Sequence, residues 1–352
     1  MRMKKLLFAT CCIAFLSGSL GAAAQKKSAA KNVLTQTLKG KSWSADNGNG
    51  TFTNPLFYDE FSDPDIIRVG EDYYLAGTTM HSVPGLVVLH SKDLVNWEFS
   101  SYCFDRFDNS DDFNLRNGKE AYGQGIWAPA IRYHNGKFYI FSNINGHGLQ
   151  VYISDSAKGP WTHHKVNGDI YDLSVLFDED GKIYAVHKYG NVTVTELKPD
   201  LSGPVEGSSK VVIPEGNAMG EGHHVYKING MYYILSADYS PMGRMQCARS
   251  KSIWGPYETC VISERESYGY AAGWSVGNMG IGRPLPEDGF KFQNNKPNGL
   301  NLGCATIHQG GIVQAPDGKW WGVSMQDFNA VGRTVCLSPI TWVDGWPYFG
   351  LE

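Results

Sequence analysis

One repeated pattern limits what this chain can fold into: a short hairpin, whose second strand opens with aromatic residues, occurs five times. Turn residues (Gly, Asn, Asp) separate runs rich in Val, Ile, Tyr and Phe, which is typical of β-strands. The copies are RVGEDYYLAG (68–77), RYHNGKFYIFSN (132–143), FDEDGKIYAVHKYG (177–190), YKINGMYYILSA (226–237) and QAPDGKWWGVSM (314–325). The spacing of an amphipathic helix is almost absent, so the sequence predicts an all-β chain.

A second motif follows four of these hairpins and resembles the turn from a third strand to a fourth. Its copies are HSKDLVNWE (90–98), SDSAKGPWT (154–162), ELKPDLSGPVE (196–206) and RSKSIWGPYE (249–258). Repeats of about 40 to 50 residues with four strands each are typical of propeller blades. We therefore expect a five-bladed β-propeller with four-stranded antiparallel blades. The alternative is a β-sandwich in which the turns are similar by coincidence.

The repeat also predicts which residues meet at the axis. When the copies are aligned on the glycine of the first turn, one residue of each opens the innermost strand. These residues are Asp63, Trp127, Asp172, Glu221 and His308. Inner strands line the central axis of a propeller, so equivalent positions converge at one mouth. The sequence thus predicts three carboxylates, a histidine and a tryptophan in one small region.

Three converging carboxylates suit the cleavage of a glycosidic bond. One carboxyl group donates a proton to the leaving oxygen, and another activates water or attacks the anomeric carbon. A third carboxylate beside the acid raises the pKa of that acid by like-charge repulsion.

Charge and hydropathy exclude other classes of partner. The formal net charge is −4, and no lysine- or arginine-rich run is present, so nucleic acid is not expected as a partner. After the N-terminal segment no long apolar stretch follows, so no membrane span is expected. We find no Walker loop, dinucleotide fingerprint or HExxH zinc motif.

Five ordered segments resemble glycoside hydrolase family 43. They are SDPDIIRV, GIWAPAIRYHNGKFYI, DLSVLFDEDGKIY, EGHHVYKINGMYYIL and the series HQGGIV, WW, VGR and WVDGWP. Together they cover Asn54 to Gly350. The resemblance implies a five-bladed propeller and single-displacement hydrolysis with inversion, mostly on plant polysaccharides that contain arabinose or xylose.

Carried over by position, the resemblance assigns roles to the three carboxylates. Asp63 is the general base, Glu221 is the general acid, and Asp172 orients the acid and tunes its pKa. Two departures from the family pattern, Leu173 within "DLS" and Ala130 within "WAPA", remove no catalytic residue.

Two acidic features outside this trio are expected to be structural. Asp65, the second acid of SDPD, is expected to be a turn or strand-edge carboxylate. The acidic run of residues 178–180 is expected to lie on a solvated face at the opposite mouth.

Further residues are expected to border the substrate pocket. The resemblance makes Arg333 of the VGR segment a sugar-hydroxyl ligand, against a structural salt bridge. Trp127 is a pocket wall or packs the blade. Met80 and Gln326 lie in connections that return to the catalytic mouth. His308 is a sugar ligand, a contact of a central cation or a satisfied axial histidine. No cofactor is required, although relatives often hold a structural calcium ion in the central channel.

The ends of the chain suggest export. Residues 1–24 have a basic start, an apolar stretch and a final Ala-Ala-Ala run, the layout of a secretory signal peptide. Residues 25–50 form a polar leader, and residues 51–352 the propeller. We expect a periplasmic or extracellular protein. Many relatives continue into a C-terminal β-sandwich that is absent here, so the chain is either a one-domain form or truncated.

Two cysteines remain open at the level of sequence. Cys247 and Cys260 either bridge neighbouring strands or stay free thiols.

The leading hypothesis is a secreted exo-glycosidase that removes terminal β-D-xylosyl or α-L-arabinofuranosyl units from xylan, arabinoxylan or arabinan. The alternatives are a carbohydrate-binding propeller without catalysis and an endo-arabinanase.

Overall fold

The computed structural model describes residues 44–78, 80–107, 110–122, 124–217, 219–238, 244–263, 309–327 and 333–350. The predicted signal peptide, most of the predicted leader, and His308 lie outside these ranges. Ala45–Glu352 forms one compact unit. The described residues include no helix, and therefore no apolar helix of membrane-spanning length.

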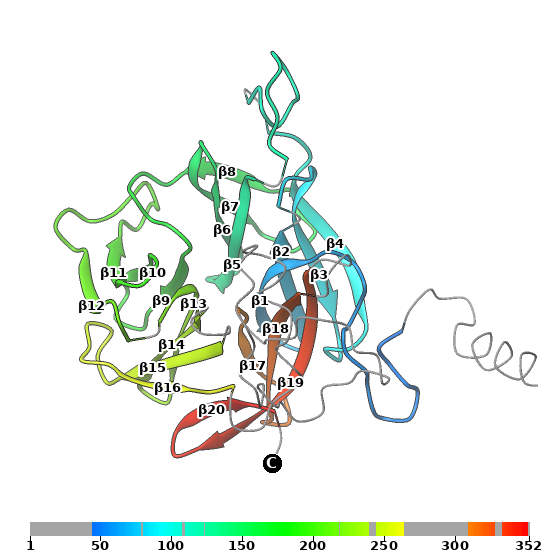
Figure 1. Cartoon of the computed structure of the whole chain (residues 1–352), viewed down its shortest axis with the longest axis vertical. Coiled ribbons are helices and arrows are strands. Elements are labelled where there is room, and N and C mark those ends of the chain that lie inside the picture. Colours follow the sequence, from blue (N-terminus) through cyan, green and yellow to red (C-terminus); the bar gives the residue numbers. More distant parts are fainter. Residues whose placement is uncertain are drawn as a thin grey trace, which may run out of the picture. The chain divides into compact units, whose positions relative to one another are not determined.

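The described strands form five four-stranded antiparallel sheets, which we number as blades I to V in chain order (Figure 1). Blade I contains β1 (Ser62–Val69), β2 (Asp72–Thr78), β3 (Gly85–Ser91) and β4 (Trp97–Phe104). Blade II contains β5 (Ile126–His134), β6 (Lys137–Ile144), β7 (Gly148–Ser154) and β8 (Thr162–Lys165). Blade III contains β9 (Ser174–Phe177), β10 (Ile183–His187), β11 (Val192–Leu197) and β12 (Lys210–Ile213). Blade IV contains β13 (Glu221–Ile228), β14 (Met231–Asp238), β15 (Arg244–Ser250) and β16 (Glu258–Val261). Blade V contains β17 (Ile312–Gln314), β18 (Trp320–Asp327), β19 (Arg333–Val343) and β20 (Trp346–Phe349).

The first strand of each blade lies nearest the centre of the ring, as Figure 1 shows for β1, β5, β9, β13 and β17. Strand β1 contacts both β5 and β17, and β9 contacts both β5 and β13. Blades IV and V are joined where the Tyr226 hydroxyl accepts a hydrogen bond from the Ile312 amide at 2.9 Å. The five-bladed propeller and its antiparallel blades are therefore confirmed.

The five predicted hairpins are the first two strands of each blade, and their turns explain their regularity. Asn135-Gly136 and Asn229-Gly230 connect strands with two residues that all have positive φ, from 49° to 80°. This conformation matches the right-handed twist of the flanking strands, and Asn-Gly tolerates it best. Local turn chemistry thus sets the register of each inner pair.

Apolar side chains fill the spaces between neighbouring blades. Phe141 and Leu149 of blade II pack with Val175 and Ala185 of blade III, and all four are almost fully buried. The aromatic residues that open the second strands take part in the same packing between blades. Trp321, for example, packs against the buried cluster that blades I and V share, and its ring lies edge-on to Phe52 of the segment before β1, with ring centroids 6.1 Å apart.

Asp65 is buried at the axis, so the prediction of a turn or strand-edge carboxylate was wrong. It is 0% exposed and accepts hydrogen bonds from the Ile131 amide at 2.9 Å and from Arg132 Nη1 at 2.6 Å. His224 Nδ1 lies 3.0 Å from its other oxygen. Side chains along β1 point alternately to its two faces. Neighbouring blades cover both faces of an inner strand, so the Asp65 side chain is buried whichever face it occupies.

Ser174 extends this contact network to blade III, because its hydroxyl accepts hydrogen bonds from Arg132 and from the Val225 amide. We call Asp65, Arg132, Ser174 and His224 the axial hub. Burial pushes the pKa of Asp65 upward, but the positive Arg132 and the His224 contact outweigh it and hold the pKa at about 2. The hub therefore joins the inner strands of blades I to IV through one ionised carboxylate.

Asp178 also differs from the expectation of a solvated acidic run. Its side chain is buried and binds Lys227 Nζ at 2.7 Å and the Tyr232 hydroxyl at 2.6 Å. Lys227 of the neighbouring blade IV therefore binds the Asp178 carboxylate where water was expected. Cys247 and Cys260 face each other across β15 and β16 but are free thiols.

The segment before β1 closes the ring against blade V. The Asn54 side chain donates to the Leu337 carbonyl and accepts from the Leu337 amide, both at 2.9 Å. The Leu56 amide donates to the Val335 carbonyl, and the Phe61 amide to the Arg333 carbonyl. We call residues 54–61 together with residues 333–337 the seam, because they join the first blade to the last.

Candidate active site

Irregular pairing at the start of the inner strands shapes the catalytic mouth. The register shifts between Ser62 and Asp65 in β1, and between Glu221 and His224 in β13. Asp63 has φ of 53°, a value that non-glycine residues rarely adopt. Bulges of this kind re-aim side chains beside functional sites. The sequence therefore interrupts the ladder at the positions that carry Asp63 and Glu221.

Asp63 is held by blade V. Its side chain is 7% exposed, and its Oδ1 lies 3.1 Å from Arg333 Nη1. The same guanidinium nitrogen donates to the Ser62 hydroxyl at 2.9 Å. The Asp63 amide points at the sulfur of Met325, 3.3 Å away. Blade V thus holds Asp63 at two points, the carboxylate through Arg333 and the backbone amide through Met325.

Asp172 lies in the connection that leads to β9, two residues before the strand that it was expected to open. It has φ of 51°, and its amide donates to Asn143 Oδ1 at 3.0 Å. Its Oδ2 accepts from the Gly222 amide at 2.6 Å. The side chain therefore bridges blade III to the residue that follows Glu221.

The electrostatics of the three carboxylates are coupled. Burial, followed by the negative charges of Glu221 and Asp63, raises the pKa of Asp172 to about 8. The Gly222 hydrogen bond and Arg333 oppose this rise. A carboxyl group with such a pKa is protonated at neutral pH, so the Asp172–Glu221 pair holds a proton where two like charges would repel.

Tyr171 contacts Glu221 directly, and sequence reasoning missed it. Its hydroxyl donates to Glu221 Oε2 at 3.0 Å, although the residue is 43% exposed. Burial and the negative charges of Glu221 and Asp172 raise the pKa of Tyr171, so the phenol keeps its proton and remains a donor. Tyr171 directly precedes Asp172 in the β8–β9 connection, and its position next to a predicted catalytic carboxylate is the signal that could have found it.

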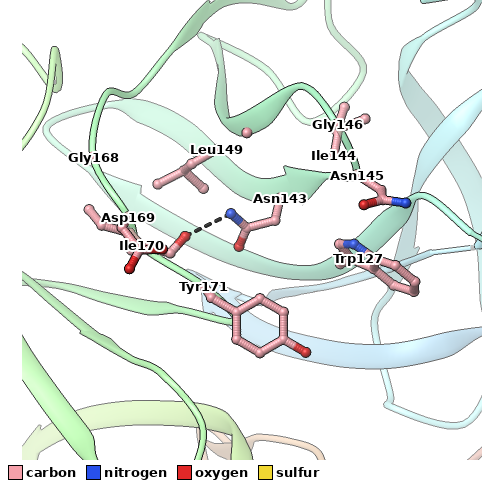
Figure 2. Close-up of a pocket in the computed structure, with 11 residues that line it drawn as sticks. Trp127, Asn143, Ile144, Asn145, Gly146, Leu149, Gly168, Asp169, Ile170 and Tyr171 are labelled. Atoms are coloured by element: carbon pink, nitrogen blue, oxygen red, sulfur yellow. Dashed lines mark hydrogen bonds between the residues drawn. The ribbon is translucent and has the colours of Figure 1, made fainter.

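A cavity of about 460 Å³ lies between blade II and the β8–β9 connection (Figure 2). We call it the side pocket. Its lining includes Trp127, Asn143, Asn145, Asp169 and Tyr171. Trp127 therefore borders this cavity together with Asn143, and its contact with a substrate sugar stays a prediction.

The other predicted site residues have different outcomes. Met80 lies beside the start of β5, where its carbonyl accepts from the Ile126 amide at 2.7 Å. Gln326 lies on β18, opposite Thr334 of β19. Arg333 forms an ion pair with Asp63, which fits the structural alternative, and its role as a sugar ligand stays a prediction. His308 lies outside the described residues.

A structural calcium ion in the central channel stays a prediction. Calcium prefers six to eight oxygen ligands. Both oxygens of Asp65 are already bonded within the hub, and the described residues hold no group of three His, Cys, Asp or Glu side chains arranged for a metal. We therefore assign no step to a metal.

Comparison with known proteins identifies relatives of this chain. A family model described as glycosyl hydrolases family 43 matches residues 52–269. A non-reducing end alpha-L-arabinofuranosidase of Bacteroides ovatus is 34% identical over 318 residues, which is 86% of this chain and 54% of that protein. A beta-xylosidase of Formosa agariphila is 29% identical over 368 residues, or 93% of this chain and 55% of that protein.

A solved structure of a bifunctional GH43-CE protein of Bacteroides eggerthii agrees with the fold. It has a TM-score of 0.70 and 33% identity, and the match covers 85% of this chain and 35% of that chain. The chain spans about half the length of the curated relatives it matches. A match over most of the propeller, together with the site geometry, shows that the chain belongs to glycosyl hydrolases family 43.

Proposed function

We propose that this chain is an exported, inverting exo-glycosidase that removes terminal β-D-xylosyl or α-L-arabinofuranosyl units from plant polysaccharides such as xylan, arabinoxylan or arabinan. The observation that carries the proposal is the coupled carboxylate trio of Asp63, Asp172 and Glu221 at one mouth. The names of the arabinofuranosidase and beta-xylosidase relatives support the substrate class.

Asp63 is the proposed general base. It takes a proton from a water molecule that attacks the anomeric carbon from the face opposite the leaving group. Arg333 Nη1 holds the carboxylate in one orientation, and the same nitrogen is itself anchored by its bond to the Ser62 hydroxyl. A single displacement of this kind inverts the configuration at the anomeric carbon.

Glu221 is the proposed general acid, and it protonates the glycosidic oxygen as the bond breaks. Asp172 supports it in two ways. The two carboxyl groups share one proton, because a negative charge on either of them opposes ionisation of the other. The bond of Asp172 to the Gly222 amide also fixes the backbone directly after Glu221.

A purely sugar-binding propeller is less consistent with this geometry. Binding sites for neutral sugars do not need a buried carboxyl group whose pKa is raised by two others, and such perturbed groups cluster at catalytic sites. Export is supported by the signal-like residues 1–24.

The proposal is tested with 4-nitrophenyl β-D-xyloside and 4-nitrophenyl α-L-arabinofuranoside in parallel, with the first-formed anomer followed by NMR. We expect release of the inverted sugar from at least one of them. Asp63→Asn should lower kcat/KM by about a thousandfold or more, and Glu221→Gln should do the same on oligosaccharides. Circular dichroism controls for folding. A retained anomer would reject the single displacement, and full activity of either variant would reject its assigned role.

A further inference from the structure

The loop between β10 and β11 is bonded to the chain on two sides of the proposed acid. The Lys188 amide donates to the Tyr171 carbonyl at 2.9 Å. The Gly190 amide donates to the Gly220 carbonyl at 3.0 Å, and Gly220 directly precedes Glu221. The Tyr171 hydroxyl in turn donates to Glu221 Oε2 at 3.0 Å. The loop therefore holds both a hydrogen-bond partner of the acid and the backbone next to the acid.

Lys188 is held in a backbone conformation that residues other than glycine rarely adopt. Its φ is 78°, in the left-handed region. Its amide bonds the Tyr171 carbonyl, and its own carbonyl lies 2.6 Å from His223 Nε2. A residue in such a conformation persists where the surrounding contacts fix it. Tyr171 and His223 supply these contacts, one on each side of Lys188.

The two ring nitrogens of His223 have different partners, and these define its protonation. The residue is 2% exposed, and burial lowers the pKa of His223 to about 4, so the ring is neutral at pH 7. The Lys188 carbonyl can only accept a hydrogen bond, so Nε2 carries the proton. Nδ1 then accepts from the Ser236 hydroxyl at 2.6 Å. Ser236 thus favours the tautomer in which His223 donates to the loop.

The peptide unit between Tyr171 and Asp172 is what Lys188 fixes. Lys188 bonds the carbonyl of this unit, and the amide of the unit donates to Asn143 Oδ1 at 3.0 Å. The Tyr171 side chain bonds Glu221, and the pKa of Asp172 is raised by burial and by the charge of Glu221. A rotation of this peptide would therefore move both side chains relative to the acid.

We infer that His223 is a positioning residue for the general acid, which acts through Lys188 on the orientation of Tyr171 and thereby on the Glu221 carboxyl group. This inference rests on the proposed function and deepens it. It assigns part of the alignment of the acid to a buried histidine two positions further along β13. Loss of the contact with Lys188 should slow the reaction in proportion to how much the leaving group needs a proton.

Two amide variants of different length test this inference. His223→Asn can still accept from Ser236 near the position of Nδ1, but it is too short to reach the Lys188 carbonyl. His223→Gln carries the same amide one bond further and can donate there. Each variant is assayed on 4-nitrophenyl and phenyl β-D-xyloside, or on the matching α-L-arabinofuranosides if the wild type prefers them.

The two leaving groups separate alignment of the acid from general damage, because nitrophenolate leaves without a proton whereas phenolate needs one much more. For His223→Asn we expect kcat to fall about tenfold or more on the phenyl glycoside and less than about threefold on the 4-nitrophenyl glycoside. His223→Gln should recover most of the loss. His223→Phe, which also lacks the donor, should behave as His223→Asn does and replaces it if that variant does not fold.

Ile234→Val is the control for a purely structural effect, since Ile234 is fully buried in β14 of the same blade. It should lower Tm and leave the ratio of the two kcat values at the wild-type level. A wild-type ratio in His223→Asn, or the same change in His223→Gln as in His223→Asn, would overturn the inference. A wild type inactive on both glycosides would instead reject the proposed function, and the inference with it.

Discussion

At the scale of single residues, the site depends on one proton held by the Asp172 carboxyl group beside the carboxylates of Glu221 and Asp63. Asp172 is 6% exposed, and burial together with Glu221 and Asp63 raises its pKa to about 8. Each unit of raised pKa costs about 1.4 kcal/mol once the group would otherwise be ionised. The catalytic arrangement therefore lowers the stability of the folded chain at neutral pH.

Asp172→Asn should remove the loss of stability caused by the raised pKa of Asp172, and the size of this effect should depend on pH. Between about pH 4 and pH 8 the unfolded chain has ionised this carboxyl group while the folded chain keeps it protonated, so folding becomes less favourable as pH rises. The asparagine variant escapes this loss. We expect its Tm to exceed that of the wild type by more than about 2 °C at pH 8 and to match it at pH 4, with activity strongly reduced.

Calorimetry at both pH values checks the prediction, with the exposed Asp105→Asn as the control. An equal shift in Tm at pH 4 and pH 8 would mean that Asp172 does not carry the raised pKa.

At the scale of elements, the inner strands carry two layers of polar residues. The catalytic layer holds Asp63 and Glu221, and the axial hub lies two or three residues further along the same strands with Asp65 and His224. Ser174 of the hub likewise follows Asp172 by two positions. The hub thus fixes the spacing of the strands that present the catalytic carboxylates.

Asp65→Asn should destabilise the fold strongly, because it removes the fully buried negative partner of Arg132, whose own side chain is only 12% exposed. Breaking a buried pair on one side typically costs about 3 to 5 kcal/mol. The folded-state pKa of Asp65 is depressed to about 2, so its contribution is present above about pH 4 and is lost as pH falls toward 2. Urea unfolding should therefore show a large loss at pH 7 and a smaller one near pH 3.

The exposed Lys137–Asp155 pair provides the control, since its side chains are 48% and 83% exposed. Asp155→Asn should change the free energy of unfolding by less than about 1 kcal/mol. A similar small effect for Asp65→Asn would show that the hub is not needed for stability.

The sequence predicted those features that depend on local chemistry or on the repeat. Turns rich in Gly, Asn and Asp identified the hairpins, and alignment of the copies located Asp63 and Glu221. Burial across a blade boundary was not visible in the same way, so Asp65 was expected at a turn or strand edge and Asp178 on a solvated face. The contact of Tyr171 with Glu221 also crosses from one blade to the next, and the direction of that side chain follows from packing.

At the scale of the whole propeller, the seam supplies the contacts that join the first blade to the last and so close the ring. Residues 54–61 follow the part of β19 that β20 does not cover, and Leu56 and Phe61 pack with Val335 and Leu337 in one buried cluster. Asn54 acts here as a short substitute for a paired strand, because its amide satisfies both backbone groups of Leu337.

Asn54→Ala should lower the free energy of unfolding by about 1 to 3 kcal/mol, since two buried backbone groups lose their partner. Asn217→Ala is a suitable control because its side chain bonds the nearby Pro214 carbonyl in an exposed turn. Denaturant unfolding of both variants measures the difference. Equal stability of the two would show that the seam does not depend on this amide.

The seam also bears on the order of events during folding. Asn54 and Leu337 lie 283 positions apart, so the ring cannot close until almost the whole chain has been synthesised. Contacts of such long range slow folding. Arg333 lies on β19, near the end of the chain. Its carbonyl accepts a hydrogen bond from the Phe61 amide, and its guanidinium donates one to the Asp63 carboxylate. The base acquires its partner only when the ring closes, so a chain that is incomplete at β19 retains four blades without an aligned catalytic site.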